Sequence, residues 1–375
     1  MLNYTCAGLF SGGGGLDLGF EMAGFSHLYS SDWDKDCIAT LQKNRPDWNV
    51  IHADVRSFCS PVNNVDVLLA GFPCQGFSLG GNRDESDERN SLFNEVVRIA
   101  KQSNARVVVI ENVLNLRNMR NPKTGRLFIT DIASAFRSAG YEVFSDFLRM
   151  SRYGVPQTRR RFLFVAFRER APVGYSLPVG SGEQSARPFL NDLAHGLKLE
   201  IPNHAPIWNF PSQVHHATGD SFNSSDPIFP VRFSRTASDG NPLRSLDAPF
   251  PAVDTATIWG WAQGSIRVER VFVDRGKHAK FIRNRSATHK LWRITASRLR
   301  SFTDREYARL QTFPDSWAFE GLTKRSVHIQ IGNAVPVEFA HRLAFNIKEA
   351  LMALDSCSSF ESDLGGPCQL SLNVA

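Results

Sequence analysis

The chain has 375 residues, of which 42% are hydrophobic and 21% are charged, the composition of a globular protein with one or two domains. Its longest apolar runs are of strand length, and its first residues lack a basic region followed by a long apolar stretch. Neither a membrane span nor a signal peptide is therefore predicted. The six cysteines are scattered, without a CxxC pair or histidines at ligand spacing, which predicts free thiols, a reducing compartment and no bound metal.

The net charge of +6 is distributed unevenly along the chain. Residues 261–300 contain eleven Lys and Arg against two acidic residues, Glu269 and Asp274, so this basic segment carries +9 and the rest of the chain −3. Such a segment favours a polyanionic partner, with nucleic acid as the first candidate. A solvated basic face is the alternative.

The first 170 residues alternate short apolar runs with helical patterns. Apolar residues at three- and four-residue spacing support helices, which we expect near 16–24, 34–44, 92–104 and 126–139. Strands are predicted at 4–10, 27–31, 49–53, 65–72, 106–111, 141–148 and 161–167. Strands that are apolar on both faces and alternate with helices form a mostly parallel sheet covered on two sides. The prediction is a doubly wound α/β domain.

The regular patterns fade after about residue 171, where Pro, Gly, Ser, Asn and Asp become frequent. A helix start returns at Thr303, because Glu306 three residues later completes a capping box. A last helix is expected at roughly 336–354, and the tail from 355 is expected to be disordered. We therefore divide the chain into an α/β domain, a smaller irregular domain, a segment that returns to the first domain, and a tail, at 1–171, 172–325, 326–354 and 355–375.

Four consecutive glycines, Gly12 to Gly15, follow the first predicted strand. Glycines there let the backbone approach a ligand closely, with amides at a helix start pointing at it, although a merely tight turn would look the same. No Lys-Ser/Thr pair follows, and the pattern GxGxxG fails in every register, so neither a P-loop nor a dinucleotide fingerprint is present. Asp32 and Asp54 end the next two strands, where they suit a ribose and an adenine amino group. A nucleoside cofactor is predicted at this sheet edge.

Cys74 follows the fourth predicted strand in the sequence GFPCQGFS. A free cysteine is usually a small buried hydrophobe, as we expect for Cys6, Cys37 and Cys59. The setting of Cys74 differs, because a proline and two glycines surround it and the polar loop that follows could close over a substrate. Glu111 ends the fifth strand and should share this edge, where its alternative role is a salt bridge or a helix cap.

Three arginines, Arg159, Arg160 and Arg161, lead into the seventh predicted strand. By alternation Arg159 and Arg161 share one face and Arg160 points away. A positive neighbourhood stabilises a thiolate, and these arginines could supply it to the cysteine. A solvated basic edge is the alternative for all three.

In combination, these motifs resemble those of a known family. FSGGGGLDLGFEMAG, GFPCQGFS, ENV, QTRRRF, RLQTFPDSW and IGNAVP match, in order, motifs of the DNA (cytosine-5) methyltransferases, over roughly residues 4–170 and 300–350. The resemblance is to the prokaryotic restriction-modification type. It implies the fold of S-adenosylmethionine-dependent methyltransferases, with 1–171 as the catalytic domain and 172–325 as the target-recognition domain that binds DNA.

The resemblance implies a reaction and its residues. A cytosine turned out of duplex DNA would receive a methyl group on carbon 5 from S-adenosylmethionine. Cys74 would add to carbon 6, Glu111 would bind the exocyclic amine and ring nitrogen 3, and Arg161, assisted by Arg159, would hold the base. The expected cofactor-binding residues are Phe10, Gly12, Gly13, Gly14, Gly15, Asp32, Trp33, Asp54, Val55, Pro73, Leu92, Asn333 and Val335.

The DNA-binding residues are expected in two places. Gln75 and Ser78 lie beside the cysteine, and the basic segment supplies candidates for phosphate or guanine contacts that the sequence does not distinguish. The candidates in the basic segment are Arg267, Arg270, Arg275, Arg283 and Arg285.

The expected partner is double-stranded DNA, with a cognate restriction endonuclease acting on the same site without direct contact. We expect a monomer in the bacterial cytoplasm, associated with the nucleoid through DNA. One alternative is RNA cytosine-5 methylation, since one branch of the family acts on a transfer RNA. The other is a catalytically inactive DNA-binding relative, which the intact motifs make less favourable.

Overall fold

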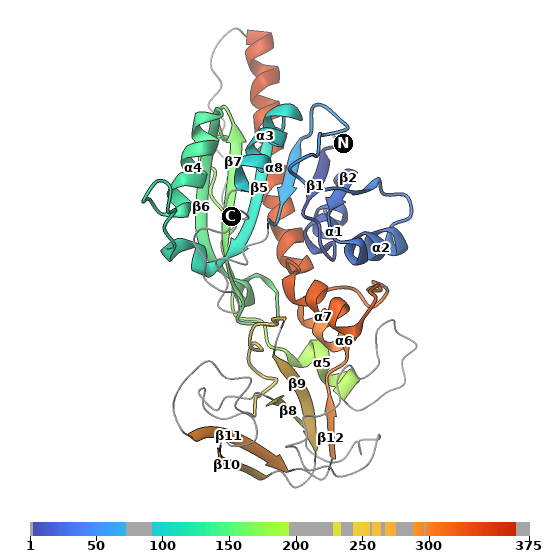
Figure 1. The fold of residues 1–375 in the computed structure, drawn as a ribbon. Coiled ribbons are helices and arrows are strands. Elements are labelled where there is room, and N and C mark those ends of the chain that lie inside the picture. The colour runs from blue at the N-terminus through green and yellow to red at the C-terminus, as the bar shows by residue number, and fades with distance from the viewer. Residues whose placement is uncertain are drawn as a thin grey trace.

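A seven-stranded sheet forms the centre of the N-terminal domain (Figure 1). The structure is a computed structural model that describes residues 3–72, 92–194, 228–233, 243–255, 257–263, 267–274, 288–295 and 298–364. The strands are β1 (Thr5–Leu9), β2 (Ser26–Asp32), β3 (Val50–His52), β4 (Val67–Ala70), β5 (Val107–Val113), β6 (Tyr141–Arg149) and β7 (Arg160–Arg168). All seven predicted strands are confirmed.

The sheet has the order β3-β2-β1-β4-β5-β7-β6. The strands from β3 to β5 run parallel, whereas β7 is antiparallel to both of its neighbours. The direction in which successive strands are added reverses between β1 and β4. In sheets of this kind ligands bind at such a reversal, outside the carboxyl ends of the strands. The doubly wound, mostly parallel sheet is as predicted.

Helices cover both faces of the sheet. The four predicted helices are confirmed as α1 (Gly15–Met22), α2 (Lys35–Asn44), α3 (Phe93–Gln102) and α4 (Phe128–Ser138), and two 3-10 turns, η2 (Leu114–Asn118) and η3 (Met150–Tyr153), follow β5 and β6. On β5, Val108 and Ile110 pack with α3 and α4, while Val107 and Val109 pack with α1 and α8 (Val337–Leu364). Because alternate side chains are buried on opposite faces, the strand is apolar throughout.

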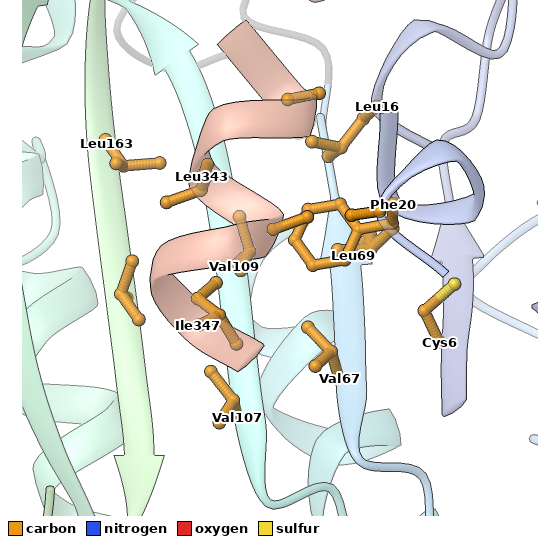
Figure 2. Close-up of a cluster of buried hydrophobic side chains, with 14 of the residues drawn as sticks. Cys6, Leu16, Phe20, Val67, Leu69, Val107, Val109, Leu163, Leu343 and Ile347 are labelled. Carbon is orange, nitrogen blue, oxygen red and sulfur yellow. The ribbon is translucent and has the colours of Figure 1, made fainter. Parts of the chain in front are cut away.

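The face opposite α3 and α4 is covered by a helix from the far end of the sequence. Figure 2 shows Leu343 and Ile347 of α8 pointing at the strands, and Phe20 of α1 lying beside them. Helix α8, which follows residue 326 in the sequence, therefore packs against the sheet of the first domain.

Helix α8 continues to Leu364, past the predicted end at 354. The expectation of a disordered tail from 355 is wrong for the residues up to 364. The cause is a long-range contact at the sheet edge: the Tyr4 hydroxyl donates to the Asp355 carboxylate at 2.8 Å, and Arg106 forms an ion pair with the same carboxylate. Local composition does not reveal such a partner.

The second part of the molecule is built from short strands (Figure 1). Strands β8 (Ile228–Phe233), β9 (Ile258–Gln263) and β12 (Arg298–Ser301) form an antiparallel sheet of order β12-β9-β8. Strands β10 (Arg267–Asp274) and β11 (Thr288–Thr295) form a separate antiparallel pair. The sequence did not reveal these sheets.

Three further helices, α5 (Arg187–Ala194), α6 (Asp304–Leu310) and α7 (Lys324–Asn333), connect the two parts. The predicted capping box is present, since the Thr303 hydroxyl accepts from the Glu306 amide and the Glu306 carboxylate accepts from the Thr303 amide. Helix α7 spans the boundary that we placed between 325 and 326. The other boundaries between segments stay predictions.

One hydrophobic cluster is shared by both parts of the molecule. Leu18 of α1 and Leu41 of α2 belong to the same cluster as Trp259 and Trp261 of β9, with Tyr307 of α6 also in it. Figure 1 shows α6 and α7 between the large sheet and the β8–β12 region. The second part of the molecule is therefore attached to the sheet domain through a packed core.

Asp304, the first residue of α6, predicts a pH-dependent stability. Its carboxylate is buried, and its Oδ1 atom has no hydrogen-bond partner among the described residues. Burial raises its pKa from 3.8 to about 7, with the charges of Lys324 and Arg305 opposing. Because the folded state binds this proton more tightly than the unfolded state, the stability it contributes is lost as the pH rises from about 4 through 7.

We therefore expect Asp304→Asn to raise the free energy of unfolding at pH 8 by roughly 1–3 kcal/mol, the gain being reduced by the lost helix-start charge. The gain should shrink as the pH falls towards 4. Urea unfolding at several pH values measures it, with the exposed Asp47→Asn as control. A gain that does not change with pH would contradict the assignment.

Candidate active site

Many of the described site residues lie where β1, β2, β3 and β5 end, at the carboxyl edge of the sheet. The glycine turn follows β1 directly and leads into α1. Its Gly12 has φ 54° and donates its amide to Asp32 Oδ2 at 2.8 Å, while the Asp34 amide donates to Asp32 Oδ1 at 2.9 Å. Burial raises the pKa of Asp32, and these two hydrogen bonds oppose the shift. Each carboxylate oxygen can still accept a further donor.

The four glycines of the turn serve two different purposes. A Cβ on Gly15 would lie 2.1 Å from the carbonyl oxygen of Val335 in the return segment. A Cβ on Gly14 would lie 2.7 Å from the Leu41 side chain and 2.8 Å from the Trp317 ring, and one on Gly13 would lie 3.1 Å from the Phe319 ring. At Gly12 the nearest atom would be 3.9 Å away. Three of the glycines therefore let other parts of the chain pack closely against the turn. Only Gly12 leaves the space that we expected for a ligand.

Two aromatic side chains border the end of β1 and β2. Trp33 follows Asp32 and is 71% exposed, unusual for so large an apolar ring. Phe10 has φ 55° and stands edge-on to Phe72, with ring centroids 6.4 Å apart. The exposed Trp33 ring and the half-buried Phe10 ring thus lie near the buried carboxylate of Asp32.

The remaining described candidates for cofactor binding lie in varied settings. Asp54 is exposed and pairs with Arg56 at 2.6 Å, and the hydrogen bonds from Arg56 lower the pKa of this carboxyl. Leu92, just before α3, is half-buried. At the end of α7 Asn333 is exposed, whereas Val335 is buried against the glycine turn.

Glu111 and Arg161 form an ion pair at the end of β5. Arg161 Nε lies 2.8 Å from Glu111 Oε1, and the two side chains are 17% and 9% exposed. Strand pairing causes this meeting, because β7 runs antiparallel to β5 and places Arg161 opposite Val113. The salt bridge that we considered as the alternative for Glu111 is present. The pair also brings a positive charge to the edge where the fourth strand ends.

Asn112 fixes the backbone next to this pair. Its side-chain amide donates to the Phe72 carbonyl at 3.4 Å, and its oxygen accepts from the Val113 amide at 2.7 Å. Phe72 is the last described residue before the loop that contains Cys74. The Asn of the ENV motif therefore holds the point where that loop leaves the sheet. The candidates Pro73, Cys74, Gln75 and Ser78 lie outside the described residues.

Arg159 is 1% exposed, and its guanidinium contacts carbonyl groups of the chain itself. It donates to the carbonyls of Val253 at 2.8 Å, Gly332 at 2.9 Å and Asn333 at 3.4 Å. Burial lowers its pKa, and the neighbouring charge of Arg161 adds to the shift. Arg159 thus holds the return segment, and a direct contact with a base stays a prediction. Arg160 is exposed, consistent with the expected alternation.

Sequence reasoning missed two buried glutamines that complete this connection. Gln157 donates to the Leu310 carbonyl at 2.6 Å and to Gln311 at 2.8 Å, and it accepts from the Val253 amide at 2.9 Å. Gln311 in turn donates to the Ile331 carbonyl at 2.6 Å. Both glutamines stand inside quoted motifs, QTRRRF and RLQTFPDSW, so the signal was present.

The basic segment is only partly described. Arg267 and Arg270 belong to β10, opposite Thr295 and Trp292 of β11, but the structure does not describe their side chains. Arg275, Arg283 and Arg285 lie outside the described residues. Arg300 pairs with the buried Glu306 at 2.7 Å, so one charge of the segment is used in packing.

The described residues contain neither a cluster of metal ligands nor a membrane-spanning helix. No group of three or more His, Cys, Asp or Glu residues there could hold a metal ion. None of the described helices combines the length and the apolar character that crossing a membrane requires.

Comparisons with known proteins agree with this geometry. Type II methyltransferase M.Eco47II of Escherichia coli is 33% identical over 364 residues, covering 93% of this chain and 79% of its own. Type II methyltransferase M.FnuDI of Fusobacterium nucleatum is 30% identical over 352 residues, covering 92% and 94%. Among solved structures, the S. pombe Dnmt2 methyltransferase has a TM-score of 0.56 at 15% identity, covering 95% of this chain and 99% of its own. That likeness shows the fold.

A family model described as C-5 cytosine-specific DNA methylase matches residues 4–349. The match contains the glycine turn, the Glu111–Arg161 pair and most of the return segment, in which Val335 packs against the turn. The chain therefore belongs to the C-5 cytosine-specific DNA methylases, and it is an enzyme of that class.

Proposed function

We propose that the chain methylates carbon 5 of a cytosine within a specific sequence of duplex DNA, as the modification enzyme of a restriction-modification pair. The observation that carries this proposal is the Glu111–Arg161 pair at the end of β5. The pair consists of a carboxylate and a guanidinium, the groups that a cytosine ring needs as partners. It lies near the end of β4, after which the sequence continues to Cys74.

The residues at the ends of β1 and β2 fit S-adenosylmethionine, which supplies an electrophilic methyl group on a sulfonium. Asp32 is buried and held by two backbone amides, so it can receive ribose hydroxyls without reorganising. The exposed Trp33 ring offers a face to the adenine, and the open space at Gly12 suits the methionine part. Asp54 would bind the adenine amino group. The further lining residues would be Phe10, Gly13, Gly14, Gly15, Val55, Pro73, Leu92, Asn333 and Val335.

Cys74 would activate the base. Carbon 5 of cytosine is a weak nucleophile, and a thiolate that forms a bond to carbon 6 pushes the ring electrons towards carbon 5. Carbon 5 can then take up the methyl group. Loss of the carbon 5 proton to water returns an electron pair to the ring, the 5,6 double bond forms again, and the carbon–sulfur bond breaks. The thiolate is thereby regenerated.

Glu111 and Arg161 would hold the ring during this addition. Glu111 would bind the exocyclic amine and hydrogen-bond ring nitrogen 3, where electron density collects when the thiolate adds. Arg161 would hold the carbonyl oxygen of the base while its Nε keeps Glu111 in place. The buried Arg159 would assist by fixing the segment that closes the site.

The target base would have to leave the DNA stack to reach this edge, at a cost of a few kcal/mol. Phosphate contacts from the basic segment would offset that cost. We propose Arg267, Arg270, Arg275, Arg283 and Arg285 for these contacts and for base reading, with Gln75 and Ser78 next to the flipped nucleotide. We further propose a monomer in the bacterial cytoplasm, whose partner endonuclease acts on the same site without touching it.

The activity is tested by incubating the protein with labelled S-adenosylmethionine and mixed-sequence duplex DNA, followed by bisulfite sequencing. Methylated cytosines within one recurring sequence are the expected result, and they identify the recognition site. Competition with transfer RNA distinguishes the alternative substrate. Label in RNA rather than in DNA would contradict the proposal.

The cysteine assignment is tested with duplex DNA that carries a 5-fluorocytosine at the target position. Because fluorine does not leave carbon 5 as a proton does, we expect the protein to remain covalently attached when the cofactor is supplied. Cys74→Ser should give no adduct and no turnover, while cofactor binding survives. Cys59 is exposed, so the expectation of a buried thiol is wrong for this cysteine, whereas Cys6 and Cys37 are buried. Cys59→Ser is therefore the matched control and should behave as the wild type. A wild-type protein that forms no adduct would rule out this mechanism.

Glu111→Gln should lower kcat by roughly 10²- to 10³-fold, because the amide cannot exchange a proton with ring nitrogen 3. The Kd for DNA should change little. Single-turnover kinetics and DNA titrations separate the two quantities. Glu349→Gln, an exposed carboxylate on α8, serves as the control. Unchanged kinetics in Glu111→Gln would remove the role that we give to this side chain.

A further inference from the structure

A second group of arginines lies at the ends of β6 and β7, outside the basic segment. Arg149 is the last residue of β6 and Arg160 is the first of β7, and the strand register places them directly opposite each other. Opposed residues of antiparallel strands have Cβ atoms about 4.5–5.5 Å apart, and like charges in this position are destabilising. The fold therefore keeps an unfavourable charge pair at this strand end.

A third arginine joins them from η2. The Arg117 guanidinium lies over the Phe147 ring, 5.5 Å from its centroid. Phe147 is two residues before Arg149, and it packs on Phe162, two residues after Arg160, with centroids 4.3 Å apart. The two rings thus form an apolar base beside the opposed pair. We call Arg117, Arg149 and Arg160 the strand-end arginines.

The strand-end arginines are only partly neutralised. Glu183 pairs with Arg149 at 2.9 Å. Arg117 and Arg160 are exposed, and neither forms an ion pair with another described residue. Another exposed arginine does pair with an acid, since Arg187 lies 2.6 Å from Asp247. Arg117 and Arg160, the second of which belongs to the opposed pair, thus form a surface suited to an anion.

The cluster borders the candidate active site. Arg160 directly precedes Arg161, whose Nη1 donates to the Arg160 carbonyl at 2.9 Å and whose Nε pairs with Glu111. Arg117 belongs to η2, which follows β5 and its ENV residues immediately. Any polyanion bound here would therefore run past the sheet edge near which Glu111 lies, two residues before the end of β5.

We propose that Arg117 and Arg160, supported by Arg149, bind the DNA phosphates that flank the flipped cytosine. This inference rests on the proposed function for the identity of the polyanion. Guanidinium groups match phosphate through paired hydrogen bonds, and DNA offers closely spaced phosphates along each strand. Contacts to phosphate carry no sequence information. The strand-end arginines therefore position the DNA backbone, and the second part of the molecule, with strands β8 to β12, reads the bases.

The proposal is tested with Arg117→Gln, Arg160→Gln and the double variant. DNA affinity is measured without cofactor over a range of salt concentrations, on duplexes with and without the recognition site. Each single variant should weaken binding about 3- to 10-fold at low salt. It should also reduce the slope of log affinity against log salt by about 0.9 for each phosphate that the variant no longer neutralises. The weakening should be equal on both duplexes, and kcat at saturating DNA should stay unchanged.

Controls separate this role from folding and from general charge. Lys101→Gln removes an exposed positive charge at the last turn of α3 and should leave the salt slope as in the wild type. Arg160→Lys should recover part of the affinity because the charge is kept. Arg160→Gln should not lower the melting temperature, since it removes a like-charge contact.

An unchanged salt slope in the double variant would overturn the proposal, as would a weakening confined to the duplex with the recognition site. A weakening seen with RNA but not with duplex DNA would overturn it as well. Failure of the proposed function would appear differently, as an absence of methylated cytosines with the wild-type protein.

Discussion

A buried guanidinium holds together the parts of the chain from which the site is built. Arg159 begins the approach to β7, yet its hydrogen bonds go to Val253 in the second part and to Gly332 and Asn333 at the end of α7. Burying a charge is costly unless its donors are satisfied, and backbone carbonyls here accept from both terminal nitrogens of the guanidinium, while Nε has no partner among the described residues. Because the partners are main-chain atoms, the contact fixes the path of the chain at three places together. The geometry of the sheet edge depends on this contact.

The same connection explains why the glycine turn and the return segment meet. Helix α7 ends at Asn333, and the chain then passes so close to Gly15 that a methyl group there would collide with the Val335 carbonyl oxygen. Gln157 and Gln311 add hydrogen bonds between the same segments. The carboxyl edge of the sheet is therefore shaped by residues from both ends of the sequence. The shared core of α1, α2 and β9 extends this constraint to the second part of the molecule.

Local patterns were sufficient for the strands and helices of the N-terminal domain and for the sheet edge that holds the candidate site, whereas they did not reveal the sheets of the second part. The alternation of apolar runs predicted the seven strands, and carboxylates at strand ends predicted that Asp32 and Glu111 lie at the carboxyl edge of the sheet. The capping box at Thr303 was readable because both partners are three residues apart. What failed depends on contacts between distant segments. The crowding of Gly15 and the anchoring of α8 by Asp355 both need partners that no local window contains.

Arginine shows most clearly why charge counting along the sequence is not enough. Arg159 is buried on carbonyls, and Arg300, inside the most basic segment, is paired with the buried Glu306. Arg161 pairs with Glu111 and donates to the carbonyl of Arg160. Only the tertiary partners decide which of these side chains keeps its charge available. The charge of Arg160 stays available to a ligand, because alternation along β7 turns this side chain away from the partners of Arg159 and Arg161. A phosphate-binding surface can thus arise next to the active site in a part of the chain whose net charge gave no sign of it.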